Sequence, residues 1–270
     1  MFVWCSGSDG PETLARILHD GVELVQLDSA GVEQWLASGL VDDSRVWAGA
    51  QGVYADGVAE NALAFLLAAA KRFPQAVHAQ SWAAVSSRTL RGATVGIVGA
   101  GGIGERLIEL LEPFRVKTIA LTRTGREVPG ATRSVGSEHL DDLLAESEHV
   151  VLAAPLTRAT HHLIGGRELE LIGPNGGLVN VGRGALVDTE ALICALRDGR
   201  LGVACIDVTD PEPLPDGHPL WELENVLVTP HVSHPYGAHT IPLGVRVEEN
   251  LRRFAVGTPP LGVVDLVAGY

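Results

Sequence analysis

Apolar and polar positions change period from one segment of the chain to the next. After residue 93, short apolar runs of strand length alternate with stretches in which apolar residues recur at helical spacing. The runs predict strands at residues 94–98, 116–121, 149–153, 177–181, 203–208 and 226–228. The stretches between them predict helices at residues 103–114, 140–146, 167–171 and 189–198. Strands joined by helices predict a parallel, doubly wound sheet of the Rossmann type, so the fold class is α/β.

The two ends of the chain predict a second, smaller α/β unit. Residues 1 to about 57 combine short apolar runs with polar turns. Residues 58–73 are apolar on most helical faces, which indicates a helix buried between two parts of the molecule. A further helical stretch at 241–254 can return to the first unit. The predicted domains are a discontinuous one of residues 1–82 and 237–270, and one of residues 83–236.

Composition excludes several classes of protein. The chain has 270 residues, of which 46% are apolar, enough to bury a sizeable core. Its formal net charge of -13 argues against a nucleic-acid or anionic-membrane partner, because phosphate binding needs clustered Lys and Arg. The odd, widely spaced Cys5, Cys194 and Cys205 indicate neither a disulfide framework nor a metal site. Since neither a membrane-length apolar run nor a signal-peptide pattern is found, we expect a cytosolic protein.

A glycine-rich turn follows the first predicted strand of the second domain. Its G-x-G-x-x-G spacing stands between a strand pattern and a helix pattern. In this motif the first glycine permits a tight turn, the second lets backbone approach a pyrophosphate, and the third lets the helix pack closely. The helix then offers its N-terminal amides to the phosphates. The predicted cofactor-binding residues of this turn are Gly99, Gly101, Gly102, Ile103 and Gly104.

Residues after the second predicted strand bear on the choice between NAD and NADP. An acidic residue usually receives the adenosine ribose hydroxyls at this place, but this chain has Thr122, Arg123 and Thr124. A carboxylate would repel a 2′-phosphate, whereas an arginine between two hydroxyl side chains can bind it. The segment therefore favours NADP(H) over NAD(H). The alternative is that Arg123 is one solvated charge among many.

Three further polar residues stand where predicted strands end. Arg183 follows the fourth strand, Glu212 the fifth and His231 the sixth. Ligands of open α/β sheets bind at the carboxyl ends of the strands, so we expect these side chains in one site. Each alone has a simpler interpretation, as a capping arginine, a solvated loop carboxylate or a turn histidine. Together, at successive strand ends, they favour a catalytic site.

With these motifs in this order, the chain resembles the D-isomer-specific 2-hydroxyacid dehydrogenases over nearly its whole length. Besides the three segments that hold Arg183, Glu212 and His231, the resemblance includes Ala59-Glu60-Asn61-Ala62, Pro155-Leu156-Thr157 and His218-Pro219-Leu220-Trp221. It implies an NAD(P)-dependent oxidoreductase with a smaller, flavodoxin-like substrate-binding domain. It also implies a homodimer joined through the nucleotide-binding domain.

The resemblance gives each site residue a role. Arg183 would bind the carboxylate and carbonyl of a 2-oxo acid, His231 would be the acid and base, and Glu212 its partner. Asp207 would hold the nicotinamide carboxamide. The other implied residues are Pro155, Thr160, Val181 and Gly182 for the cofactor, and Ala30, Gly31 and Val32, with Arg183 and His231, for the substrate.

The chemistry requires these residue types independently of the resemblance. Reduction of a ketone by hydride builds negative charge on oxygen, so a proton donor with a pKa near neutrality must lie beside it, as histidine can. A carboxylate on the distal ring nitrogen favours the imidazolium. Arginine can hold a carboxylate through two parallel hydrogen bonds. We therefore expect a reductase of a small 2-oxo acid such as glyoxylate or hydroxypyruvate.

Two departures from the family pattern leave alternatives open. The chain before Ser29 is shorter than in the family, so we expect an N-terminally shortened small domain, and His234-Pro235-Tyr236 replaces small polar residues after the histidine. One alternative is an NAD(P)(H)-binding sensor, similar to a corepressor, with little or no turnover. Retention of all three catalytic residues counts against it. Another alternative keeps the enzyme class and oxidises formate or phosphite.

Overall fold

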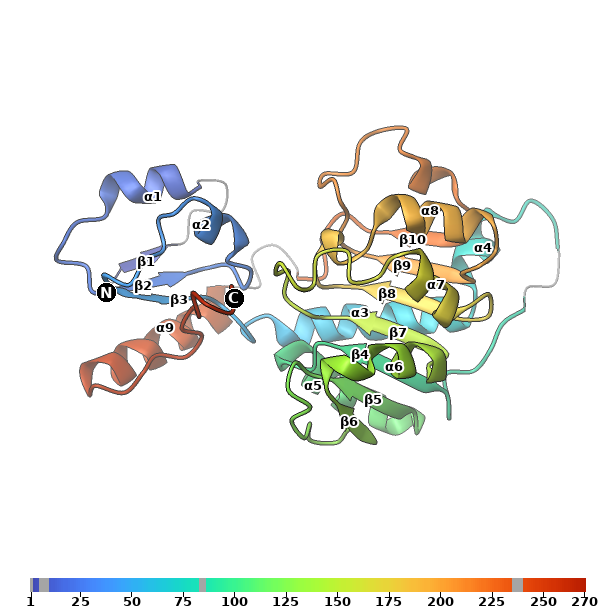
Figure 1. Cartoon of the computed structure of the whole chain (residues 1–270), viewed down its shortest axis with the longest axis horizontal. Helices are drawn as coiled ribbons and strands as arrows, with labels where there is room; N and C mark the ends of the chain where they lie inside the picture. Colours follow the sequence, from blue (N-terminus) through green and yellow to red (C-terminus); the bar gives the residue numbers. More distant parts are fainter. Residues whose placement is uncertain (1, 5–9, 83–85, 235–239) are drawn as a thin grey trace. The chain divides into compact units, whose positions relative to one another are not determined.

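The computed structural model describes residues 2–4, 10–82, 86–234 and 240–270. The chain divides into two compact units, one made of Met1–Tyr54 with His234–Tyr270 and the other of Ala55–Ser233 (Figure 1).

The larger unit is built on a seven-stranded parallel sheet, which confirms the predicted doubly wound α/β class (Figure 1). The strand order is β10-β9-β8-β7-β4-β5-β6. The strands are β4 (Thr94–Val98), β5 (Lys117–Leu121), β6 (Arg133–Val135), β7 (His149–Leu152), β8 (Gly177–Asn180), β9 (Val203–Ile206) and β10 (Val226–Val228). The direction of strand succession reverses between β4 and β7, and ligands bind at such a switch point in open α/β sheets.

Helices cover both faces of this sheet. On β4, Ile97 faces helix α5 and the preceding Gly96 faces Leu143 of helix α6. Successive strand residues point to opposite faces, so the two helices lie on opposite sides of the sheet. The helices are α3 (Ala55–Ala70), α4 (Phe73–His78), α5 (Gly102–Leu111), α6 (Leu140–Glu146), α7 (Gly166–Ile172) and α8 (Thr189–Arg197). No helix in the described part of the chain has the length and apolar character needed to cross a membrane.

Element boundaries differ from the predictions in informative places. Helix α5 ends at Leu111 and a 3₁₀ turn follows, because Pro113 lacks the N–H that a continuing α-helix needs. Strands β7, β8 and β9 each stop one or two residues before their predicted ends. The residues beyond leave the ladder at the carboxyl edge and enter loops. The short β6 and α4 were not predicted.

The smaller unit has a three-stranded parallel sheet in the order β1-β2-β3. All four residues of the central strand are buried, as expected where both faces are covered. The C-terminal segment returns to this sheet, because Asn250 Nδ2 donates to Gln26 Oε1 (2.7 Å) and Val264 N donates to Trp47 O (2.9 Å). The elements are β1 (Phe2–Trp4), β2 (Leu24–Leu27), β3 (Val46–Ala48), α1 (Pro11–Ile17), α2 (Glu33–Ala37) and α9 (Thr240–Ala255).

The units divide at Tyr54 and Ser233, whereas the sequence placed the divisions near residues 82 and 236. The difference at the first division comes from α3. This helix packs against α5, β8 and β9, so its apolar residues are buried within the larger unit.

Candidate active site

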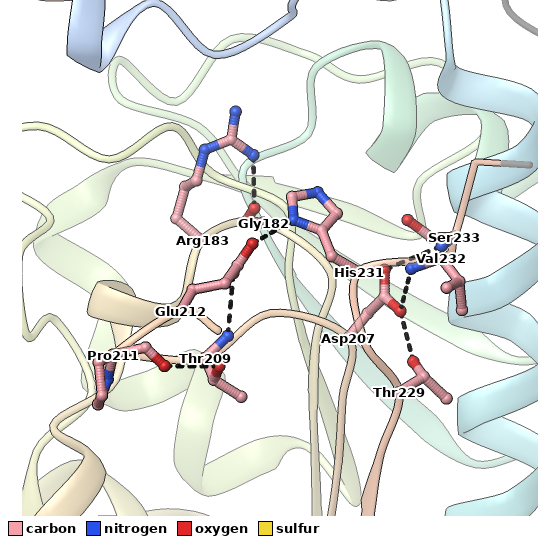
Figure 2. Close-up of polar contacts among 10 residues, drawn as sticks. All are labelled: Gly182, Arg183, Asp207, Thr209, Pro211, Glu212, Thr229, His231, Val232 and Ser233. Carbon is pink, nitrogen blue, oxygen red and sulfur yellow. Dashed lines mark hydrogen bonds and ion pairs between the residues drawn. The ribbon is translucent and has the colours of Figure 1, made fainter. Parts of the chain in front are cut away.

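Neighbouring strand ends at the carboxyl edge of the larger sheet hold the predicted catalytic residues. Parallel strands β8, β9 and β10 are adjacent, so the loops that follow them lie side by side. Figure 2 shows Glu212 and His231 in contact, with Arg183 next to them. The structure therefore brings together the three residues that the sequence grouped.

Glu212 and His231 form a close acid–base pair. His231 Nδ1 lies 2.6 Å from Glu212 Oε1, and both side chains are about half exposed (Figure 2). The hydrogen bond to Glu212 raises the pKa of His231, against the opposing effects of partial burial and the Arg183 charge. The same bond lowers the pKa of Glu212. The pair thus favours an imidazolium beside a carboxylate, with Nε2 left to act on a ligand.

A buried carboxylate fixes the backbone that holds His231. Asp207 is 1% exposed, and its carboxylate accepts hydrogen bonds from Val232 N and Ser233 N, each at 3.0 Å, and from the Thr229 hydroxyl (Figure 2). His231 has a φ of 53°, in the left-handed region that non-glycine residues seldom adopt. Three hydrogen bonds from residues 229–233 to one buried carboxylate hold this turn in place.

The turn after β8 positions Arg183. Asn180 is buried, its Oδ1 accepts from Gly182 N (3.1 Å), and its Nδ2 donates to Arg183 O (2.9 Å). Arg183 Nη1 donates to Gly182 O at 2.8 Å. Val181 N donates to Leu152 O (3.1 Å), so the backbone beyond β8 stays next to the end of β7.

A glycine lets the turn after β8 touch the loop that carries Glu212. A Cβ on Gly184 would collide with the carbonyl group of Thr209. Thr209 N in turn donates to Glu212 Oε2 at 3.3 Å. The loop of Arg183 and the loop of Glu212 are therefore in backbone contact, which sets the relative places of the two side chains.

The glycine turn after β4 fits a dinucleotide pyrophosphate. Gly99 has a φ of 93°, and a Cβ there would lie 2.5 Å from backbone atoms beyond β7, so only glycine fits. Nothing lies within 4 Å of a Cβ placed on Gly101, which leaves the backbone open to a ligand. A Cβ on Gly104 would lie 2.9 Å from Gly99 O, because α5 begins close against the turn. Gly102 and Ile103 open this helix, whose N-terminal end favours anions.

The other predicted cofactor residues lie on two loops of the same edge. After β5, Thr122 is buried, whereas Arg123 and Thr124 are exposed. Within the described residues, no carboxylate forms an ion pair with the Arg123 guanidinium. After β7, Thr160 Oγ1 donates to Pro155 O at 2.7 Å, which closes that loop on itself.

Comparison with known proteins decides the family. Residues 63–233 match the family described as D-isomer specific 2-hydroxyacid dehydrogenase, NAD binding domain, and this stretch is more than half of the chain. The chain belongs to the D-isomer specific 2-hydroxyacid dehydrogenases. It is therefore an NAD(P)-dependent oxidoreductase of 2-hydroxy acids, as the resemblance implied, and the matched region is its cofactor-binding domain.

Relatives of this dehydrogenase cover most of its length. An uncharacterized protein of Corynebacterium melassecola is 40% identical over 259 residues, which are 94% of this chain and 85% of that protein. A glyoxylate reductase of Aeropyrum pernix is 38% identical over 229 residues, 79% of this chain and 68% of that protein. The D-isomer specific 2-hydroxyacid dehydrogenase of Xanthobacter autotrophicus, solved with NADPH and MES, has a TM-score of 0.83 at 34% identity, over 92% of this chain and 79% of that one. The NADPH-dependent glyoxylate/hydroxypyruvate reductase of Sinorhizobium meliloti, solved with NADP and sulfate, has a TM-score of 0.86 at 27% identity, over 99% and 85%.

The predicted carboxylate loop of this dehydrogenase lies in the smaller unit, between β2 and α2. Val32 is buried there, and Ala30 and Gly31 are partly exposed. The turn is fixed by Ala50 N, which donates to Ser29 O at 2.9 Å. The role of these residues in substrate binding stays a prediction.

Three residues that organise the site were not singled out from the sequence. They are Asn180, Gly184 and Thr209. The Gly-Arg-Gly sequence around Arg183 was a signal for a close backbone approach, since glycine is placed where a Cβ would collide. Thr209 acts through its backbone amide, and no side-chain pattern announces that role.

Proposed function

We propose that this dehydrogenase reduces a small 2-oxo acid of the glyoxylate or hydroxypyruvate kind, with NADP(H) favoured and NAD(H) as the other cofactor. The observation that carries the proposal is the 2.6 Å pair of His231 and Glu212 next to Arg183. The names of two relatives support the substrate class, since one is a glyoxylate reductase and the other a glyoxylate/hydroxypyruvate reductase.

Each catalytic residue has a distinct task in this proposal. Arg183 binds the substrate carboxylate and carbonyl through parallel hydrogen bonds, which orients the carbonyl face. His231 Nε2 donates a proton to the carbonyl oxygen as negative charge develops there. Glu212 stabilises the imidazolium before transfer and keeps the ring oriented through Nδ1. The backbone of Ala30, Gly31 and Val32 receives the substrate carboxylate from the smaller unit.

The cofactor, when bound, supplies the hydride that adds to the carbonyl carbon. The glycine turn receives its pyrophosphate, and Arg123 with Thr122 and Thr124 receives the 2′-phosphate of NADP(H). The complexes of two relatives with NADPH or NADP support this preference. Pro155, Thr160, Val181 and Gly182 also bind the cofactor, and Asp207 contributes to the carboxamide contact.

The proposal is tested by the oxidation of NADPH and NADH, measured side by side against glyoxylate, hydroxypyruvate, pyruvate and phenylpyruvate. We expect turnover on glyoxylate and hydroxypyruvate, faster with NADPH, and its loss in His231→Ala. Equal or better turnover on phenylpyruvate contradicts the substrate class. Tight cofactor binding with no turnover on any acid supports the sensor alternative instead.

We also propose a homodimer joined through the larger unit. Large apolar side chains are exposed on and after α4, where Phe73 is 54% exposed, Val77 74% and Trp82 106%. Large apolar side chains that are exposed in one segment are typical of a surface that a partner covers. Sedimentation velocity should give a dimer that dissociates more readily in Trp82→Ser, and a monomer at micromolar concentration contradicts the proposal.

A further inference from the structure

Arg126 joins the two loops on which the cofactor proposal depends. Its Nη2 donates to Ala100 O, inside the glycine turn, at 2.7 Å and lies 2.7 Å from Glu105 Oε1 on α5. Its backbone N donates to Thr122 Oγ1 at 3.0 Å. One residue is therefore bound to the glycine turn, to the helix after it and to the end of β5. Hydrogen bonds with a charged donor are about twice as strong as neutral ones, so the guanidinium is the stronger part of this link.

The segment that Arg126 fixes is the one that presents Arg123. Arg123 and Thr124 are exposed and lie between the two bonded residues Thr122 and Arg126. Thr124 also forms an isolated β-bridge with Gly136, which attaches the segment to the residues after β6. The Ser137 hydroxyl also donates to Arg123 O, at 3.4 Å. Without the guanidinium contacts, the segment would keep these contacts and the bond to the Thr122 hydroxyl but would lose its link to the glycine turn and α5.

The glycine turn has a second attachment that does not involve Arg126. Gly99 N and Ala100 N both donate to Leu121 O, at 3.0 and 3.3 Å. The turn therefore stays on β5 when the Arg126 side chain is removed. Loss of Arg126 should consequently affect the loop of Arg123 more than the pyrophosphate turn.

We infer that Arg126 is a positioning residue for recognition of the 2′-phosphate, which it serves by holding the Arg123 loop against the glycine turn through Ala100 and Glu105. The inference rests on the proposed preference for NADP(H). Preorganising a charged side chain lowers the entropic cost of binding its ligand. Arg126 therefore increases the affinity for NADPH without contacting the cofactor itself.

Equilibrium binding of NADPH and NADH to the substrate-free protein tests the inference, with intrinsic fluorescence or calorimetry as the readout. Arg126→Met keeps much of the side-chain length and removes the donors. We expect the Kd for NADPH to rise about tenfold and that for NADH to rise by less than about threefold. Arg126→Lys, which keeps one charged donor, should retain more of the preference. In a protein that already carries Arg123→Ala, Arg126→Met should not change the ratio of the Kd values for NADPH and NADH any further, because Arg126 acts through Arg123.

A matched control is available on β6. Arg133 Nη2 lies 2.8 Å from Glu146 Oε1, and the Arg133 side chain is 45% exposed, compared with 47% for Arg126. Among the described residues, the Arg133 guanidinium forms no hydrogen bond or ion pair with the glycine turn or the Arg123 loop. Arg133→Met should leave both dissociation constants unchanged. If the wild type prefers NADPH and Arg126→Met keeps that preference, the inference about Arg126 is wrong and the proposed cofactor preference stands. Equal weakening of both cofactors, or additive effects with Arg123→Ala, also overturns it. A wild-type protein that binds NADH as tightly as NADPH contradicts the proposed preference and this inference with it.

Discussion

The two edges of the larger sheet treat buried ionisable groups in opposite ways. At the carboxyl edge, Asp207 is 1% exposed and accepts three hydrogen bonds from the segment of His231. At the amino edge, His149 opens β7 and is 3% exposed, and its Nδ1 has no hydrogen-bond partner within the described residues. Burial lowers the pKa of His149 to about 4, and the positive charges of Arg72 and Arg88 act in the same direction.

This difference shows that the two edges differ in the hydrogen-bond partners that they provide for buried ionisable side chains. A buried charge is stable only when it is paired or hydrogen-bonded, and otherwise the group becomes neutral. The carboxyl edge provides those partners and keeps His231, Glu212 and Asp207 in fixed places. At the amino edge, the described residues provide no hydrogen-bond partner for His149 Nδ1, and the side chain stays neutral at physiological pH and costs stability when it must be charged.

The largest effect is expected at the carboxyl edge, from His231→Ala. Loss of the proton donor should lower kcat by about 100- to 10,000-fold, while the Kd for NADPH stays within about twofold because the glycine turn is untouched. His139→Ala is a matched control, since His139 Nδ1 also lies beside a carboxylate, 3.1 Å from Asp142 Oδ2, outside the site. Steady-state kinetics with glyoxylate measures kcat for both variants. A similar kcat for wild type and His231→Ala would show that His231 is not the proton donor.

A smaller effect should follow from Gly184→Ala. The added Cβ collides with the Thr209 carbonyl and must displace the loop that carries Glu212. We expect a loss of about 1–3 kcal/mol in the free energy of unfolding and about a tenfold drop in kcat/KM from misplacement of the pair. Gly166→Ala is the control, because nothing lies within 4 Å of its added Cβ. Urea titration and kinetics that show the two variants alike would refute the proposed backbone contact.

The features that could be predicted from the sequence are those that depend on local patterns, and the others depend on contacts between segments that are distant along the chain. The order of strands and helices, the glycine turn and the grouping of Arg183, Glu212 and His231 depend on local periodicity and residue type, which the sequence displays directly. The contact of Gly184 with Thr209 depends on how two loops meet in space. The division of the units at Tyr54 depends on which neighbours α3 selects.

Asp207 shows the limit for a single side chain. The family resemblance implied a contact with the nicotinamide carboxamide, and the structure shows that two of the three donors to its carboxylate are backbone amides. Amides have no side-chain signature, so the ordering of the His231 turn could not be predicted from the sequence.

The amino edge gives a prediction on stability rather than activity. His149 becomes charged in the unfolded chain near pH 6.5 but in the folded chain only near pH 4. Between these values the unfolded state binds more protons, so the free energy of unfolding decreases as the pH falls, by about 3 kcal/mol in total. His149→Val should remove this pH-dependent loss, measured by urea titration from pH 7 to pH 4. If the free energy of unfolding changed with pH in the same way in wild type and variant, the neutral state of His149 would be contradicted.

The central claim is that the pair of His231 and Glu212 supplies the proton, and the pH dependence of kcat/KM for reduction tests it most directly. Only protonated His231 can donate, so activity should fall at high pH with an apparent pKa above 6.5, because Glu212 raises the pKa of His231. Glu212→Gln removes the carboxylate and should move this descending limb to lower pH as well as reduce the maximal rate. A descending limb at the same pH in wild type and Glu212→Gln would contradict the account.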